Sequence, residues 1–130
     1  MRGWIGVMAL AVAGPGMAQD LDCHLEGTQM QLTYCAVQDW IAADADLNEA
    51  YKAARSLMRD IDADLPEAER GAEAYLRQAQ TAWITLRDAG CAAEGFMYHG
   101  GSIQPMVIYA CRARMTNVRA AELAEMASTN

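Results

Sequence analysis

Asp62-Ala63-Asp64-Leu65-Pro66-Glu67 decides the fold, because this short stretch interrupts two long helical patterns. Asp64 is a predicted helix cap, Pro66 is tolerated in a first helical turn, and Glu67 stands at the reciprocal capping position. A second helix is therefore expected to begin directly after the first. Two long helices that are joined by so short a turn must lie antiparallel.

A helical pattern lies upstream of this turn, from Thr28 to about Asp62. Thr28 and Gln31 have the spacing of a capping box, in which each side chain satisfies a free backbone N–H of the first turn. Small or apolar residues then recur in alternating steps of four and three, at Ala36, Trp40, Ala43, Leu47, Ala50, Ala54, Leu57 and Ile61. Charged residues fall off that stripe, so we expect an amphipathic helix.

Two further helices are predicted downstream of the turn. The second continues to about Glu94, and its inner face is Ala72, Leu76, Ala79, Trp83, Leu86 and Ala93. The stretch 95–101 breaks the pattern, and Ser102 is expected to cap a third helix that frays near Met126. The inner face of that helix is Ile108, Cys111, Met115 and Val118. Because no alternating strand pattern occurs, the prediction is all-α: a small antiparallel up-down bundle of about three helices.

Residues 1–18 have the three parts of a secretory signal peptide, which are a basic start, an apolar run and small residues before the cleavage point. The apolar run, Trp4 to Ala13, is too short to cross a bilayer as a helix. We therefore expect cleavage after Ala18, release without a membrane anchor, and one domain of residues 19–130 in the periplasm or the medium.

The chain is acidic, with 17 Asp and Glu against 10 Lys and Arg and a formal net charge of −7. Loss of residues 1–18 removes Arg2 and no acidic residue, so the charge of the mature chain becomes −8. Such a surface repels nucleic acid and speeds the encounter with a basic partner, although acidity also serves solubility alone.

Four cysteines lie in the mature part, and an even number in an exported chain predicts two disulfides, among Cys23, Cys35, Cys91 and Cys111. Their separations of 12, 56 and 20 residues do not fit a zinc site, so no metal or cofactor is predicted. Three pairings are possible. Counting outward from the turn brings Cys35 and Cys91 within about one helical turn of each other, which favours the bridges Cys35–Cys91 and Cys23–Cys111.

Three groups of residues, in this order, resemble the LprI-type lysozyme-inhibitor family. They are Asp44-Ala45-Asp46-Leu47-Asn48 with Tyr51, then Gln80-Thr81-Ala82-Trp83-Ile84-Thr85-Leu86-Arg87-Asp88 with Cys91, then Gly100-Gly101-Ser102 with Cys111, Thr116, Arg119 and Leu123. The resemblance implies a compact helical domain of exported bacterial proteins, many of which have no assigned activity. One lipoprotein member of the family is credited with inhibiting lysozyme. The lipoprotein cysteine is absent here, so membrane tethering is not implied.

Read physically, the shared polar residues indicate fold rather than function. Asp44 and Arg87 are level when counted from the turn, which predicts an ion pair between the two helices. We interpret the set as a structural cluster that fixes the helix register, the alternative being a binding site. Its members are Asp44, Asn48, Tyr51, Gln80, Trp83, Arg87, Asp88 and Arg119.

No catalytic residues are predicted, since Asp44 and Asp46 face different sides of a helix and cannot act as a carboxylate pair. One hypothesis is an inhibitor that binds lysozyme or a similar basic cell-wall hydrolase. Its candidate contact loop is Phe96, Met97, Tyr98 and His99, unless these aromatic residues fold back over the bundle end. The other hypothesis is an envelope module with a structural or protein-binding role and no effect on lysozyme. The sequence leaves the partner and the oligomeric state open.

Overall fold

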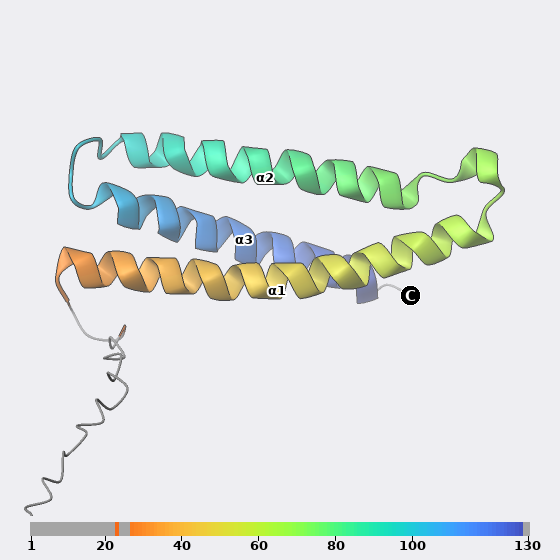
Figure 1. The fold of residues 1–130 in the computed structure, drawn as a ribbon, viewed down its shortest axis with the longest axis horizontal. Coiled ribbons are helices and arrows are strands. Elements are labelled where there is room, and N and C mark those ends of the chain that lie inside the picture. The colour runs from red at the N-terminus through yellow and green to blue at the C-terminus, as the bar shows by residue number, and fades with distance from the viewer. Residues whose placement is uncertain (1–22, 24–26, 129–130) are drawn as a thin grey trace, which may run out of the picture.

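The computed structural model describes Cys23 and residues 27–128, and every regular element in that part of the chain is helical. In order these are α1 (Gln29–Asp64), the short 3-10 helix η1 (Glu67–Glu69), α2 (Ala72–Phe96) and α3 (Gln104–Ser128). Figure 1 shows α2 returning alongside α1, and α3 running again in the direction of α1. The predicted all-α up-down bundle is confirmed for these residues. The predicted signal peptide, 1–18, lies outside them.

The start of α1 is the capping box that the sequence predicts. The Gln31 amide donates to Thr28 Oγ1 over 3.3 Å, and the Thr28 amide donates to Gln31 Oε1 over 2.8 Å. No Gly or Pro interrupts the helix before Asp64. It ends because Leu65 precedes Pro66, which disfavours the helical conformation, and Leu65 is extended with φ −99° and ψ 149°.

The start of α2 corrects one prediction, because Asp62 rather than Asp64 caps this helix. The residues after Pro66 form η1, so α2 begins later in the chain. Its first backbone amides then lie beside the last turn of α1. The Asp62 carboxylate accepts hydrogen bonds from the amides of Gly71, Ala72 and Glu73 at 2.8, 2.9 and 3.0 Å. A single side chain thus satisfies most of the orphan donors of α2 and ties the two helices together.

Small side chains let α1 and α3 approach closely along most of their length (Figure 1). The buried alanines of this seam are Ala36, Ala43 and Ala54 on α1 and Ala113 and Ala120 on α3. Where α2 joins them, the core is completed by larger residues, among which Leu47, Leu76 and Leu123 are 3%, 5% and 0% exposed. The bundle is therefore a close α1–α3 pair, and α2 packs alongside both of these helices.

The inner face of α2 is more polar than predicted. Leu86 is 62% exposed, because the neighbouring Arg87 takes the inward position together with Gln80. Val118 on α3 is likewise 57% exposed, since the inward positions on either side of it are Thr116 and Ala120. None of the helices in the described part of the chain is long and apolar enough to cross a membrane.

The predicted disulfide pairing is wrong: the bridges are Cys23–Cys35 and Cys91–Cys111. Measured from the Asp44–Arg87 contact, Cys35 lies about 13 Å along its helix and Cys91 only about 6 Å, so the two are not level. Cys91 instead faces α3, where Cys111 lies at a similar distance from the connecting loop. Each bridge therefore joins a cysteine to the next cysteine along the chain.

Candidate functional site

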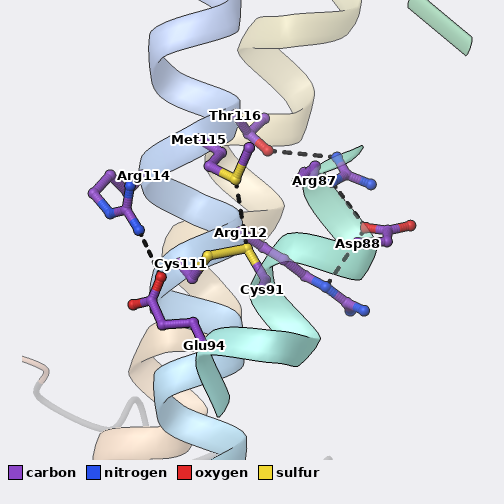
Figure 2. Close-up of a disulfide and its surroundings, with 9 residues drawn as sticks. All are labelled: Arg87, Asp88, Cys91, Glu94, Cys111, Arg112, Arg114, Met115 and Thr116. Atoms are coloured by element: carbon purple, nitrogen blue, oxygen red, sulfur yellow. Dashed lines mark hydrogen bonds and ion pairs between the residues drawn. A yellow bond between two sulfur atoms is a disulfide. The ribbon is translucent and has the colours of Figure 1, made fainter. Parts of the chain in front are cut away.

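Arg87 is a buried charge that contacts all three helices, and its side chain is only 8% exposed. Its Nε donates to Asp88 Oδ1 over 2.9 Å, and its Nη1 donates to Thr116 Oγ1 over 3.4 Å (Figure 2). Nη1 also lies 3.6 Å from Asp44 Oδ1 on α1, so the predicted inter-helix ion pair is present. Buried charges require such partners, and here the partners fix the register of the helices.

Aromatic rings surround this guanidinium. The Arg87 Cζ atom lies 5.2 Å from the centroid of Trp83 and 5.7 Å from that of Trp40. A second guanidinium, that of Arg112, lies 5.2 Å from Trp40 and 5.5 Å from Tyr109, and the two rings are 5.6 Å apart. Rings at these distances stabilise desolvated cations. We call this group the Arg87 cluster, composed of Trp40, Asp44, Trp83, Arg87, Asp88, Tyr109, Arg112 and Thr116.

The Arg87 cluster is closely packed rather than open to a ligand. The nearby hollow, lined by Trp40, Ile41 and Asp44, has a volume of about 90 Å³. Small-molecule sites usually measure about 300–1,000 Å³. Arg112 Nε is buried and makes no hydrogen bond within the described residues, although it lies 3.6 Å from Asp88 Oδ1. Charge and ring contacts, rather than a cavity, thus characterise this group.

The remaining motif residues support the same frame. Gln80 is buried, and its Oε1 accepts a 3.1 Å hydrogen bond from Arg119 Nε on α3. Arg119 also donates to Glu122 over 3.0 Å. On α1, Asn48 Nδ2 donates to Asp44 Oδ2 over 3.5 Å, and Tyr51 packs against the core. The structure therefore places the eight predicted motif residues in or beside the contacts between helices.

The candidate contact loop lies apart from the Arg87 cluster, at the end of the bundle where α2 turns into α3. Phe96, Met97 and Tyr98 are 64%, 74% and 43% exposed, so they do not fold back over the bundle end. His99 stacks on Phe96 with ring centroids 4.9 Å apart and planes 1° from parallel. These four residues, which we call the apolar tip, are all exposed to solvent.

The predicted structural cluster omits four members of the Arg87 cluster. The sequence names Trp40 only as an apolar residue of the α1 face and Thr116 only among the residues that carry the family resemblance, and it gives no cluster role to Tyr109 and Arg112. The available signal is that Tyr109 and Arg112 are three residues apart and so share a face of one helix. Their meeting with Trp40 depends on the close α1–α3 seam, which no local pattern reveals.

The described cysteines and the carboxylates of the Arg87 cluster are engaged in contacts within the protein. The four cysteines are oxidised in pairs. Within the residues that the structure describes, no group of three or more His, Cys, Asp or Glu side chains is placed to hold a metal ion. The Asp44 and Asp88 carboxylates face arginines. The Arg87 cluster therefore joins the three helices, and the apolar tip is exposed at one end of the bundle.

Comparison with known proteins gives a consistent family. A family model described as "Lysozyme inhibitor LprI" matches residues 23–123, a range that holds all four cysteines. An uncharacterized protein of Rhizobium meliloti (strain 1021) is 40% identical over 124 residues, which is 92% of this chain and 89% of that protein. The crystal structure of a DUF1311 family protein from Pseudomonas putida KT2440 superposes with a TM-score of 0.66 at 29% identity, covering 77% of this chain and 94% of that one.

Proposed function

Since the chain belongs to the LprI lysozyme-inhibitor family, we propose that it is an exported, non-enzymatic protein that inhibits lysozyme or a related basic cell-wall hydrolase by binding it directly. The observation that carries this proposal is the family match across residues 23–123, which includes both disulfides and the whole Arg87 cluster. We propose further that residues 1–18 are removed on export and that residues 19–130 form one domain.

The disulfides support an extracytoplasmic place of action. Such bridges form and persist in oxidising compartments and are rare in the cytosol. A cell-wall hydrolase acts outside the cytoplasmic membrane, so inhibitor and target would share a compartment. Both bridges close short segments, of 12 and 20 residues, and therefore stabilise a fold whose core is small.

Charge supports a basic target. After removal of residues 1–18 the formal net charge is −8, and this charge attracts a cationic enzyme over a range set by the ionic strength, about 10 Å at 0.1 M salt. Complementary charge raises the association rate and orients the partners more than it deepens the final affinity. We therefore expect a short-range contact surface in addition to the charge.

A turbidity assay tests the proposal. The oxidised chain, purified after export, is added in micromolar excess to a chicken-type lysozyme that is clearing a suspension of bacterial cell walls. We expect slower clearing, with the effect weakening as salt rises from about 0.02 to 0.2 M, where the screening length shortens severalfold. The same chain after reduction and alkylation is the control for fold dependence. Clearing that is unchanged at every salt concentration contradicts inhibition and favours an envelope-binding module without this activity.

A further inference from the structure

The apolar tip, Phe96, Met97, Tyr98 and His99, exposes large apolar side chains in consecutive positions. Phe96 and Met97 are 64% and 74% exposed, which is unusual for side chains of this size at the end of a helix. Each immobilised aromatic residue offers a large contact area at a low cost in conformational entropy. A surface of this composition is typical of a protein contact rather than of a solvated loop.

The backbone beneath the apolar tip is held in one shape. The amides of Tyr98, His99 and Gly101 donate to the carbonyls of Gly95, Phe96 and Tyr98 over 3.0, 3.1 and 2.9 Å. Gly100, with a φ of +80°, permits the reversal into α3, and its amide donates to Gln104 Oε1 over 3.1 Å. A loop that is already ordered loses little entropy on binding, so its side chains contribute more fully to affinity.

Two cross-connections brace the helices that carry the loop. The Cys91–Cys111 disulfide joins α2 to α3 about one and a half turns from the loop. Between this bridge and the loop, Gly95 is buried against Ile108, where a Cβ atom would collide with the isoleucine side chain. The apolar tip is therefore displayed on a rigid support, the arrangement in which a loop can enter a site on another protein.

The start of α1 lies at the same end of the bundle (Figure 1) and carries further exposed apolar side chains. Met30 and Tyr34, one helical turn apart, are 83% and 44% exposed. Gln29 Nε2 lies 3.5 Å from Met106 Sδ, which fixes the start of α1 against the start of α3. Exposed apolar residues of two chain segments therefore lie toward the same end of the bundle.

We infer that the apolar tip is the inhibitory contact and that it enters the substrate cleft of a basic, lysozyme-type hydrolase. This inference rests on the proposed function and names its surface. A loop at the narrow end of a rod is convex. Such a loop fits into an elongated, polysaccharide-binding cleft better than it fits against a flat surface. The acidic charge of the chain matches a basic enzyme and excludes most acidic proteins as occupants. The ring of His99 adds an N–H hydrogen-bond donor that can meet a carboxylate of a glycosidase.

A matched pair of double variants tests this inference. Phe96→Ala with Met97→Ala removes the two side chains of the apolar tip that are more exposed than Tyr98, at 64% and 74%. Leu86→Ala with Tyr75→Ala removes side chains of the same exposure, 62% and 74%, from the flank of α2. Chicken-type lysozyme is the probe, and the readouts are the inhibition constant for cell-wall clearing and the dissociation constant from calorimetry. Circular dichroism and the melting temperature confirm that both variants are folded.

We expect the tip variant to lose at least about a hundredfold in both constants, since loss of a central contact residue commonly costs this much, and the flank variant to change less than about threefold. A short chitin oligosaccharide that occupies the lysozyme cleft is expected to compete with the wild-type chain. Three outcomes overturn the inference. If the wild-type chain inhibits and the tip variant inhibits equally, or if the oligosaccharide does not compete, the proposed function stands and this surface is wrong. If the wild-type chain neither binds nor inhibits lysozyme, both proposals fail.

Discussion

Arg87 on α2 donates a 3.4 Å hydrogen bond to Thr116 on α3, and both side chains are buried in the middle of the bundle. Arg87 also faces Asp44 on α1, so one side chain bridges the three helices. Both side chains of this contact are shielded from solvent. The residues that fix the fold are therefore different from the surface that we propose binds the partner.

Replacement of Arg87 tests the structural role of the Arg87 cluster. Arg87→Ala leaves the Thr116 hydroxyl without its donor and removes the cation between two tryptophan rings. We expect the free energy of unfolding to fall by about 2–4 kcal/mol. The control, Arg77→Ala on the exposed face of α2, should change it by less than about 0.5 kcal/mol. Urea denaturation measures both. A variant that keeps its stability and loses lysozyme binding would show that the cluster is a binding site.

The cap of α2 gives a prediction that separates two neighbouring aspartates. Asp62→Ala removes the acceptor of three backbone hydrogen bonds, so the urea midpoint should fall clearly. Asp64→Ala should leave the midpoint almost unchanged, because Asp64 is an exposed residue at the end of α1. The reverse order of effects would mean that Asp64 caps the helix after all.

Two carboxyl groups at this end of the bundle, those of Asp62 and Glu73, are expected to make the fold less stable in acid. Hydrogen bonds from the amides of Gly71, then Glu73 and Ala72, hold the pKa of Asp62 below its ordinary value of 3.8. A hydrogen bond from Arg55, then one from Arg59, holds the pKa of Glu73 below 4.5. Each group therefore binds protons more readily in the unfolded chain. Its contribution is complete above about pH 5 and disappears as the pH falls through the lowered pKa values.

Urea midpoints measured from pH 6 down to about pH 2 check this dependence. The double variant Asp62→Asn with Glu73→Gln should be less stable than the parent near neutral pH and should lose less stability on acidification. Parallel curves for the parent and the double variant would contradict the assignment of the acid sensitivity to these two carboxyls.

Two glycines of α2 should respond to alanine in opposite directions. At Gly95 a Cβ atom would lie 2.9 Å from Ile108 Cδ1 and closer still to Cγ1, so Gly95→Ala should destabilise the chain by about 1–3 kcal/mol. At Gly90 no atom lies within 4 Å of an added Cβ, so Gly90→Ala should stabilise the helix by about 0.5–1 kcal/mol. Thermal unfolding distinguishes them, and equal effects would contradict the close approach of α2 and α3.

The disulfides should differ in their access to a reducing agent. Cys91 and Cys111 are 0% and 3% exposed, whereas Cys23 is exposed and Cys35 is partly exposed. Because exchange requires a thiolate to reach a sulfur atom, mild reduction of the folded chain should open Cys23–Cys35 first. Alkylation followed by peptide mass spectrometry identifies the opened pair. Modification of Cys91 and Cys111 before the other two would contradict the burial of that bridge.

Local signals in the sequence predict the helices well. They predict the contacts between helices poorly. The capping box of Thr28 and Gln31 predicts the start of α1, because both partners lie within one turn. The level positions of Asp44 and Arg87 follow from counting along two antiparallel helices. The disulfide pairing does not follow in this way, since it depends on which faces of the helices meet.

The inner face of α2 shows the same limit. An apolar pattern selects Leu86, yet the buried position belongs to Arg87, whose charge is satisfied by Asp44, Asp88 and Thr116 from three helices. The cap of α2 by Asp62 depends likewise on the 3-10 turn that precedes the helix. The polar residues of the interior can therefore be identified only from the packing of all three helices, not from the pattern of one helix.

Isothermal titration of the oxidised, folded chain into chicken-type lysozyme at low salt tests direct inhibition without any cell-wall substrate. We predict saturable binding of one chain to one enzyme molecule, with an affinity that weakens as salt is added and is lost when Phe96 and Met97 are replaced by alanine. A titration without heat of binding, confirmed by the unchanged sedimentation of both folded proteins in a mixture, would contradict the account.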